Sequence, residues 1–184
     1  MMRTASYPGR RSALAALLAA LLLFGCAGAP GRRGTDAPDA AVYALERDIL
    51  AMGARTHRAE AALAARTAVD TSRRLAEAYR VVPPAFFHNM LIQVGVRERG
   101  LCYHWTEDMM KPLLALNLRT YQLHWGVAYR GSDLREHNSV VITASGLGFK
   151  DGLVLDPWRH SGELFWAVVR EDEYPWEELP RDQW

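Results

Sequence analysis

Three side chains far apart in the sequence have the types and the order that thiol chemistry requires: Cys102, His137 and Asp156. A thiol reacts as its thiolate, an imidazole can take the proton, and a third polar group can hold that imidazole in the correct tautomer. His137 follows the cysteine by 35 residues, and Asp156 follows His137 by 19. These residues form the candidate catalytic set.

The cysteine lies at the start of a predicted helix. Gly100 interrupts the preceding segment, and apolar residues then recur at helical spacing: Trp105, Met109, Leu113 and Leu116. Free backbone N–H groups at a helix start favour a thiolate there. The alternative is that Cys102 is a small hydrophobic residue of the core. Pro112 falls within the pattern and predicts a kink or an early end.

His137 is the best-placed of the six histidines. It begins one predicted strand, and Asp156 ends the next, so antiparallel pairing would bring them to one edge of a sheet. His104 is closer in sequence, but two helical steps rotate it by about 200° from Cys102. The other histidines show no comparable pattern: His57, His88, His124 and His160. The alternative is that His137 is a surface loop residue and that Asp156 forms a turn before Pro157.

The N-terminus has the pattern of a bacterial lipoprotein signal. Arginines precede the apolar run 13–24, which is too short to span a bilayer, since spanning takes about 20 residues. The sequence around Cys26 resembles a lipobox, so we expect cleavage of 1–25 and lipid on Cys26; an ordinary signal peptide is the alternative. Cys102 would then be the only free thiol of an exported chain, which favours a functional role.

The composition and charge of the chain limit the kinds of binding partner that we expect. Removing 1–25 takes away three of the 22 basic residues and leaves 19 against 21 acidic ones, a formal net charge of −2. No basic cluster or nucleic-acid motif is visible, so we expect no nucleic-acid partner. The remaining 159 residues are enough for one domain with a core.

The rest of the chain predicts a tether at 26–38, a helical segment at 39–84 and a core at 85–184. Asp39 could cap the first helix, and one long helix or two shorter ones would fit 39–84. Another helix is expected over 85–97 with an apolar buried side: Phe86, Phe87, Met90, Leu91 and Val94. Alternation then predicts four strands, near 123–129, 140–143, 153–155 and 164–169. Helices before strands indicate an α+β fold with an antiparallel sheet.

Three segments of the core resemble the transglutaminase-like branch of the papain-like cysteine hydrolases. They are Gly100-Leu101-Cys102-Tyr103, Glu136-His137-Asn138-Ser139-Val140-Val141 and Leu153-Val154-Leu155-Asp156-Pro157-Trp158. The resemblance covers about 86–169 and implies the papain-like architecture. The family commonly has an aromatic residue two positions after the histidine, where this chain has Ser139.

The resemblance also implies roles. Cys102 would be the nucleophile, His137 the general base and then acid, and Asp156 the orienting carboxylate. The Cys102 backbone N–H and one upstream donor, for which Gln93 is the candidate, would hold the oxyanion. No cofactor or metal is required.

The sequence therefore predicts a lipid-anchored hydrolase or acyltransferase of the bacterial envelope, facing the periplasm from the outer membrane and using a thioester intermediate on peptide or protein amides. The alternative is a non-catalytic envelope lipoprotein that keeps the fold as a docking or scaffold module. In that alternative the N-terminal helices are the docking surface, and a protein partner is the expectation for them. A metal site from Cys102, His104 and a distant histidine fits the spacing poorly.

Overall fold

The computed structural model describes residues 32–33, 38–53 and 56–184, with side chains from residue 40 onward. The cleavage site, Cys26 and most of the tether lie outside the described residues. Among the residues described, no helix is both long and apolar enough to cross a bilayer.

The helices precede almost all of the sheet. Their bounds are α2, Pro38–Leu50; α3, Arg58–Ala78; α4, Ala85–Gln93; and α5, Cys102–Ala115. The 39–84 segment thus forms two helices, and Asp39 is the second residue of α2 rather than its cap. Of the two outcomes predicted at Pro112, a kink or an early end, the early end does not occur, because α5 runs through Pro112 to Ala115.

The strands form one antiparallel sheet in the described part of the chain, in the order β1-β5-β4-β3-β2-β6. Their bounds are β1, Arg32–Arg33; β2, Tyr121–Ala128; β3, His137–Ala144; β4, Leu153–His160; β5, Glu163–Val168; and β6, Trp176–Leu179. An α+β fold with an antiparallel sheet is therefore confirmed.

The sequence predicts that strand β4 ends at Asp156-Pro157, and this prediction was wrong. The strand continues to His160 through an irregularity between Asp156 and His160. The Asp156 Oδ1 atom accepts hydrogen bonds from the backbone N–H groups of Trp158 and Arg159, both at 3.1 Å. Proline is tolerated at such an irregularity because it need not donate to a neighbouring strand.

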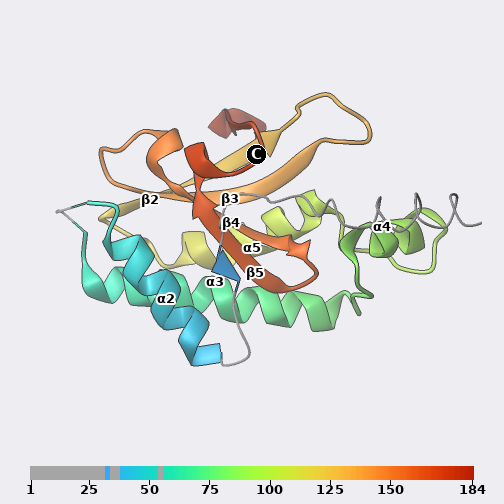
Figure 1. The fold of residues 1–184 in the computed structure, drawn as a ribbon, viewed down its shortest axis with the longest axis horizontal. Helices are drawn as coiled ribbons and strands as arrows, with labels where there is room; N and C mark the ends of the chain where they lie inside the picture. The colour runs from blue at the N-terminus through green and yellow to red at the C-terminus, as the bar shows by residue number, and fades with distance from the viewer. Residues whose placement is uncertain (1–31, 34–37, 54–55) are drawn as a thin grey trace, which may run out of the picture.

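Helices α2, α3 and α5 cover one face of the sheet, and the C-terminal segment crosses the other (Figure 1). The side of α3 that faces the sheet is built from small buried residues, which allow close approach: Ala61, Ala64, Ala65, Ala68 and Ser72. The core on this face is completed by alternate strand residues such as Val140, Ile142 and Leu155. Trp176 and Phe165 belong to a smaller core on the opposite face.

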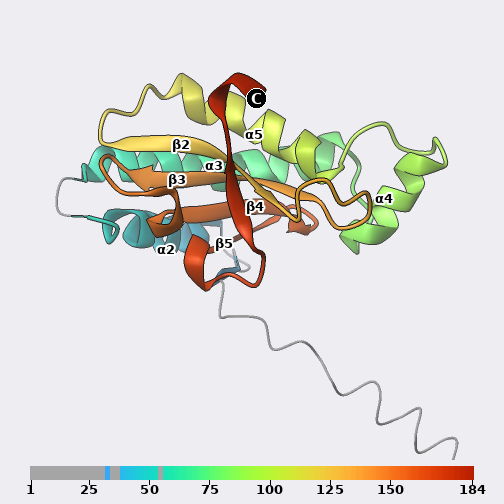
Figure 2. The same ribbon diagram turned by 90° about the horizontal axis from the view of Figure 1, so that it is seen from above.

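Helix α4 projects at one end of the molecule, next to the connection between β2 and β3 and the start of α5 (Figure 2). The expectation that its apolar residues are buried was wrong. Phe86 is 66% exposed, and Phe87, Met90 and Val94 are exposed as well, while the buried residues of α4 are Ala85 and His88.

Candidate active site

The turn before α5 is held by a buried histidine. Gly100 has φ of +127°, a conformation that favours glycine, and a Cβ atom there would lie 2.4 Å from Nε2 of His88. His88 accepts a hydrogen bond at Nδ1 from the Val82 N–H and donates from Nε2 to the Arg99 carbonyl, at 3.2 and 3.0 Å. The indole of Trp105 donates to the Gly100 carbonyl at 2.8 Å. These contacts fix the point at which Cys102 begins α5.

His104 stabilises the same helix start and does not serve the cysteine. Its Nδ1 accepts hydrogen bonds from the N–H groups of Gly100 and Leu101, at 3.2 and 3.3 Å. Burial and the nearby Arg99 lower the pKa of His104, which keeps Nδ1 free to accept. The N–H of Cys102 is one of the first N–H groups of α5, which have no acceptor within the helix.

The structure brings His137 and Asp156 together, at the edge where β3 begins and β4 leaves regular pairing. Nε2 of His137 lies 2.7 Å from Oδ2 of Asp156, and both side chains are buried. Aromatic rings surround the imidazole: Trp158, Tyr174 and Trp176, with centroids at 4.7, 5.0 and 5.3 Å. This packing holds the ring in one orientation.

Arg159 supports the carboxylate from the other side. Its Nε donates to Oδ2 of Asp156 at 3.0 Å, and its two terminal nitrogens form a bidentate pair with Asp172 at 2.8 and 2.7 Å. Asp172 also accepts a hydrogen bond from the indole of Trp176 at 2.7 Å. A buried charge network therefore links Asp156 to the C-terminal segment.

The thiol of Cys102 lies at the mouth of this arrangement. Its Sγ is 3.8 Å from the Glu136 carbonyl oxygen, and the side-chain amide of Asn138 donates toward it at 3.9 Å. The other end of that amide accepts a hydrogen bond from the Trp125 indole at 2.7 Å, which orients the NH₂ group toward the sulfur. Within the described residues, Nδ1 of His137 is buried without a hydrogen-bond partner.

The charges of the three residues shift one another's pKa. Burial alone would raise the pKa of the Cys102 thiol, but the His137 imidazole and the hydrogen bonds of Asn138 together outweigh it and the pKa is lowered. Burial would lower the pKa of His137, yet the Asp156 carboxylate raises it to about 9. Burial opposes ionisation of Asp156, and His137 with Arg159 hold its pKa well below the usual range. All three shifts act in the direction of a thiolate–imidazolium pair.

A cleft of about 340 Å³ opens above the sulfur. Its lining residues come from α4, from the start of α5, from the 129–137 segment and from the C-terminal half: Phe86, Asn89, Cys102, Tyr129, Leu134, Arg135, Glu136, His137, Trp158, Glu173 and Tyr174. Gln93 is not among them; it is exposed at the last position of α4. Asn89, one turn earlier, lines the cleft, and its Oδ1 accepts a hydrogen bond from Trp158 at 3.2 Å, which leaves its NH₂ group available.

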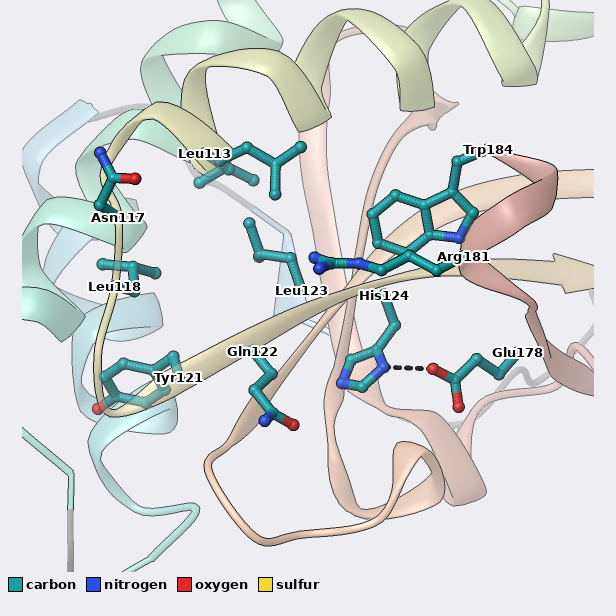
Figure 3. Close-up of a pocket in the computed structure, with 11 residues that line it drawn as sticks. Leu113, Asn117, Leu118, Tyr121, Gln122, Leu123, His124, Glu178, Arg181 and Trp184 are labelled. Atoms are coloured by element: carbon teal, nitrogen blue, oxygen red, sulfur yellow. Dashed lines mark hydrogen bonds and ion pairs between the residues drawn. The ribbon is translucent and has the colours of Figure 1, made fainter.

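A second cavity, of about 480 Å³, lies at the far end of α5 (Figure 3). Nδ1 of His124 is 2.6 Å from Glu178 there, and Nε2 is 2.9 Å from the hydroxyl of Thr143. The lining contains no cysteine or serine. This histidine therefore joins β2, β3 and β6. The hydroxyl beside it belongs to Thr143, which is fully buried and does not line the cavity.

Sequence reasoning missed four residues of the site: Asn89, Asn138, Arg159 and Asp172. Two carried a local signal, because Asn138 directly follows His137 and Arg159 is three residues after Asp156. Asp172 carried none, since its position depends on the path of the C-terminal segment.

Comparison of the chain with protein-family models, with curated proteins and with solved structures found no match. Within the described residues, no group of three His, Cys, Asp or Glu side chains is arranged to hold a metal ion.

Proposed function

We propose that this chain is a cysteine hydrolase or acyltransferase of the transglutaminase-like type, acting on amide bonds of peptides or proteins. One observation carries the proposal. A buried carboxylate, Asp156, holds Nε2 of His137, while the imidazole lowers the pKa of the Cys102 thiol beside an open cleft. A nucleophile, a base and an orienting group are the set that covalent acyl transfer requires.

The reaction follows from these positions. The Cys102 thiolate attacks the amide carbonyl carbon, and the negative charge moves to the carbonyl oxygen. The N–H of Cys102 and the amide of Asn89 are the donors we assign to that oxygen. The imidazolium of His137 then gives its proton to the departing amine as the C–N bond breaks and a thioester remains. Water or a second amine, deprotonated by His137, attacks the thioester and releases the thiol.

The order of the elements supports the family assignment. The cysteine begins a helix, the histidine begins the strand that follows β2, and the aspartate lies in the next strand. Helix α5 packs against β3 through buried residues such as Met109 and Leu113. This is the arrangement that the resemblance to transglutaminase-like hydrolases implies.

An activated ester tests the chemistry without knowledge of the natural substrate. With p-nitrophenyl acetate we expect a burst of one p-nitrophenolate per chain and one acetyl group on Cys102, detected by mass spectrometry. The thiolate attacks the acetyl carbon, and p-nitrophenolate leaves with the electron pair of the C–O bond. Cys102→Ser should show neither, and His137→Ala should show no burst. A wild-type chain that gives no burst and no adduct would favour the non-catalytic docking module.

We further propose that Cys26 carries the lipid that anchors the protein in the envelope, facing the periplasm. Cys26→Ser should then move the protein from the membrane fraction to the soluble fraction. Retention of the unlipidated variant in the membrane fraction would contradict the anchor but would leave the chemistry of Cys102 unaffected. The helices α2 and α3 remain the surface we assign to a protein partner.

A further inference from the structure

Helix α4 presents large apolar side chains to solvent beside the cleft. We define the apolar rim as Phe86, Phe87, Met90, Val94 and Leu134, all of which are exposed. Phe86, Met90 and Val94 follow one another at four-residue steps and so share one side of the helix. Leu134, which is 90% exposed, lies in the connection between β2 and β3 at the same end of the molecule (Figure 2). Exposed apolar side chains that gather in one place are typical of a binding surface.

The apolar rim is continuous with the candidate active site. Phe86 and Leu134 line the same cleft as Cys102. The ring of Phe86 meets Trp158 edge-on at 5.1 Å, and Trp158 in turn packs against the His137 imidazole at 4.7 Å. A group bound on Phe86 would therefore extend directly from a carbonyl held at Cys102.

The charged side chains of the cleft are in contact with neighbouring residues of the chain. The guanidinium of Arg135 lies over the Tyr129 ring at 3.9 Å, and Glu136 accepts a hydrogen bond from the Gly131 N–H at 2.7 Å. Glu173 lies 3.8 Å from Arg159. These charged side chains border an apolar part of the surface, formed by the apolar rim and the aromatic rings of Tyr129, Trp158 and Tyr174.

We propose that the substrate of Cys102 carries a large apolar group beside its amide, and that the apolar rim binds this group. The inference rests on the proposed function, since it assigns a substrate class to the same site. It also explains why α4 leaves several apolar side chains in water: they are covered when the substrate binds.

Alkylating reagents of matched reactivity test the proposal. The full-length chain with Cys26→Ser has Cys102 as its single cysteine. Iodoacetamide, N-hexyliodoacetamide and N-(5-carboxypentyl)iodoacetamide all react in one way: the sulfur forms a bond to the CH₂ carbon and iodide leaves. Each rate constant is divided by the rate constant of the same reagent with glutathione. We expect the hexyl reagent to react about 10- to 100-fold faster than iodoacetamide, and the carboxylate reagent to show little of this gain.

Two variants and one control locate the effect. Phe86→Ser and Leu134→Ser should each reduce the preference for the hexyl reagent, measured as the ratio of its rate constant to that of iodoacetamide with the same variant. Tyr43→Ser is the matched control, because Tyr43 on α2 is 65% exposed against 66% for Phe86 and does not line the cleft. It should leave the preference intact.

The outcomes separate this inference from the proposed function. Equal rates for the hexyl reagent and iodoacetamide, or a preference that survives both rim variants, would overturn the apolar substrate class. An iodoacetamide rate like that of an ordinary thiol would instead overturn the proposed enzymatic function. The ratio between the reagents would still decide whether the apolar rim binds an apolar group.

Discussion

Two histidine–carboxylate pairs lie in the same sheet with almost the same spacing. The His137–Asp156 pair is 2.7 Å long and buried, and the His124–Glu178 pair is 2.6 Å long, with the carboxylate half exposed. They differ at the second ring nitrogen. In His124 this nitrogen is bound to Thr143, whereas in His137 it is buried without a hydrogen bond and the ring acts on the thiol of Cys102.

The comparison shows that a short imidazole–carboxylate contact is not in itself a catalytic feature. The pair must keep one nitrogen for a nucleophile, and the nucleophile must be delivered beside it. In the function we propose, Gly100 and the start of α5 do this at the first pair. At the second pair the group beside this nitrogen is the hydroxyl of Thr143, which is fully buried, so no substrate reaches it and both contacts join strands.

The largest effect is expected from removing each imidazole in turn. His137→Ala should lower the rate of acetyl transfer from p-nitrophenyl acetate by about 100- to 10,000-fold, because the general base is lost. His124→Ala should retain the wild-type rate within about twofold and cost about 1 kcal/mol of stability. Equal losses of acylation rate in the two variants would remove the distinction between the pairs.

A large effect on stability is expected at Arg159, which supports only the His137–Asp156 pair. Arg159→Met should lower the free energy of unfolding by about 3–5 kcal/mol, because the buried carboxylates of Asp156 and Asp172 lose their counter-charge. Urea denaturation measures this, and the double variant Arg159→Met/Asp172→Asn should recover part of the loss. The matched control is Arg170→Met, whose pair with Asp151 is exposed and should contribute less than about 1 kcal/mol. An equally small loss in the free energy of unfolding of Arg159→Met would contradict a stabilising role for the buried charge network.

Removing the carboxylate charge of each pair should have different effects on the pH dependence of activity. The release of an amine needs the imidazolium, so activity should fall as pH rises through about 9, the raised pKa of His137. Asp156→Asn removes the negative charge that stabilises the imidazolium, so this alkaline limb should move to lower pH and the rate should drop on the order of 100-fold. Glu178→Gln should leave the pH–rate profile in place. A profile unchanged by Asp156→Asn would contradict the role of the carboxylate.

The smallest effect is expected from the turn that delivers the nucleophile. Gly100→Ala should cost about 1–3 kcal/mol of stability and slow the alkylation of Cys102, since the new Cβ would collide with His88 and force a strained φ. Gly95→Ala is the control: it also has positive φ but open space around it, so only the stability should fall. Equal alkylation rates for the two variants would show that the turn does not position the thiol.

Much of the site could be predicted because it depends on local patterns and one topological rule. Alternation located β2 and β3, and antiparallel pairing placed the start of β3 beside Asp156. The helical period of α5 gave Cys102 its position and set His104 on another side. These inferences need only residues within a few tens of positions of one another.

The remaining features depend on information that periodicity does not contain. The apolar face of α4 was recognised, but a period shows which residues share a face and not whether another element covers them. For the same reason the facing of Gln93 could not be deduced. The support from Arg159 and Asp172 required the course of the C-terminal segment, and β4 passes Pro157 only because Asp156 itself satisfies the backbone there.

The pH dependence of Cys102 alkylation by iodoacetamide tests the central claim most directly, since it reports whether His137 shifts the thiol. In the chain with Cys26→Ser, the rate should rise with a midpoint well below 8.5, the ordinary range of a thiol, and His137→Ala should return it to that range. His124→Ala should leave the profile unchanged. A wild-type midpoint near 8.5, or one that His137→Ala does not move, would contradict the account.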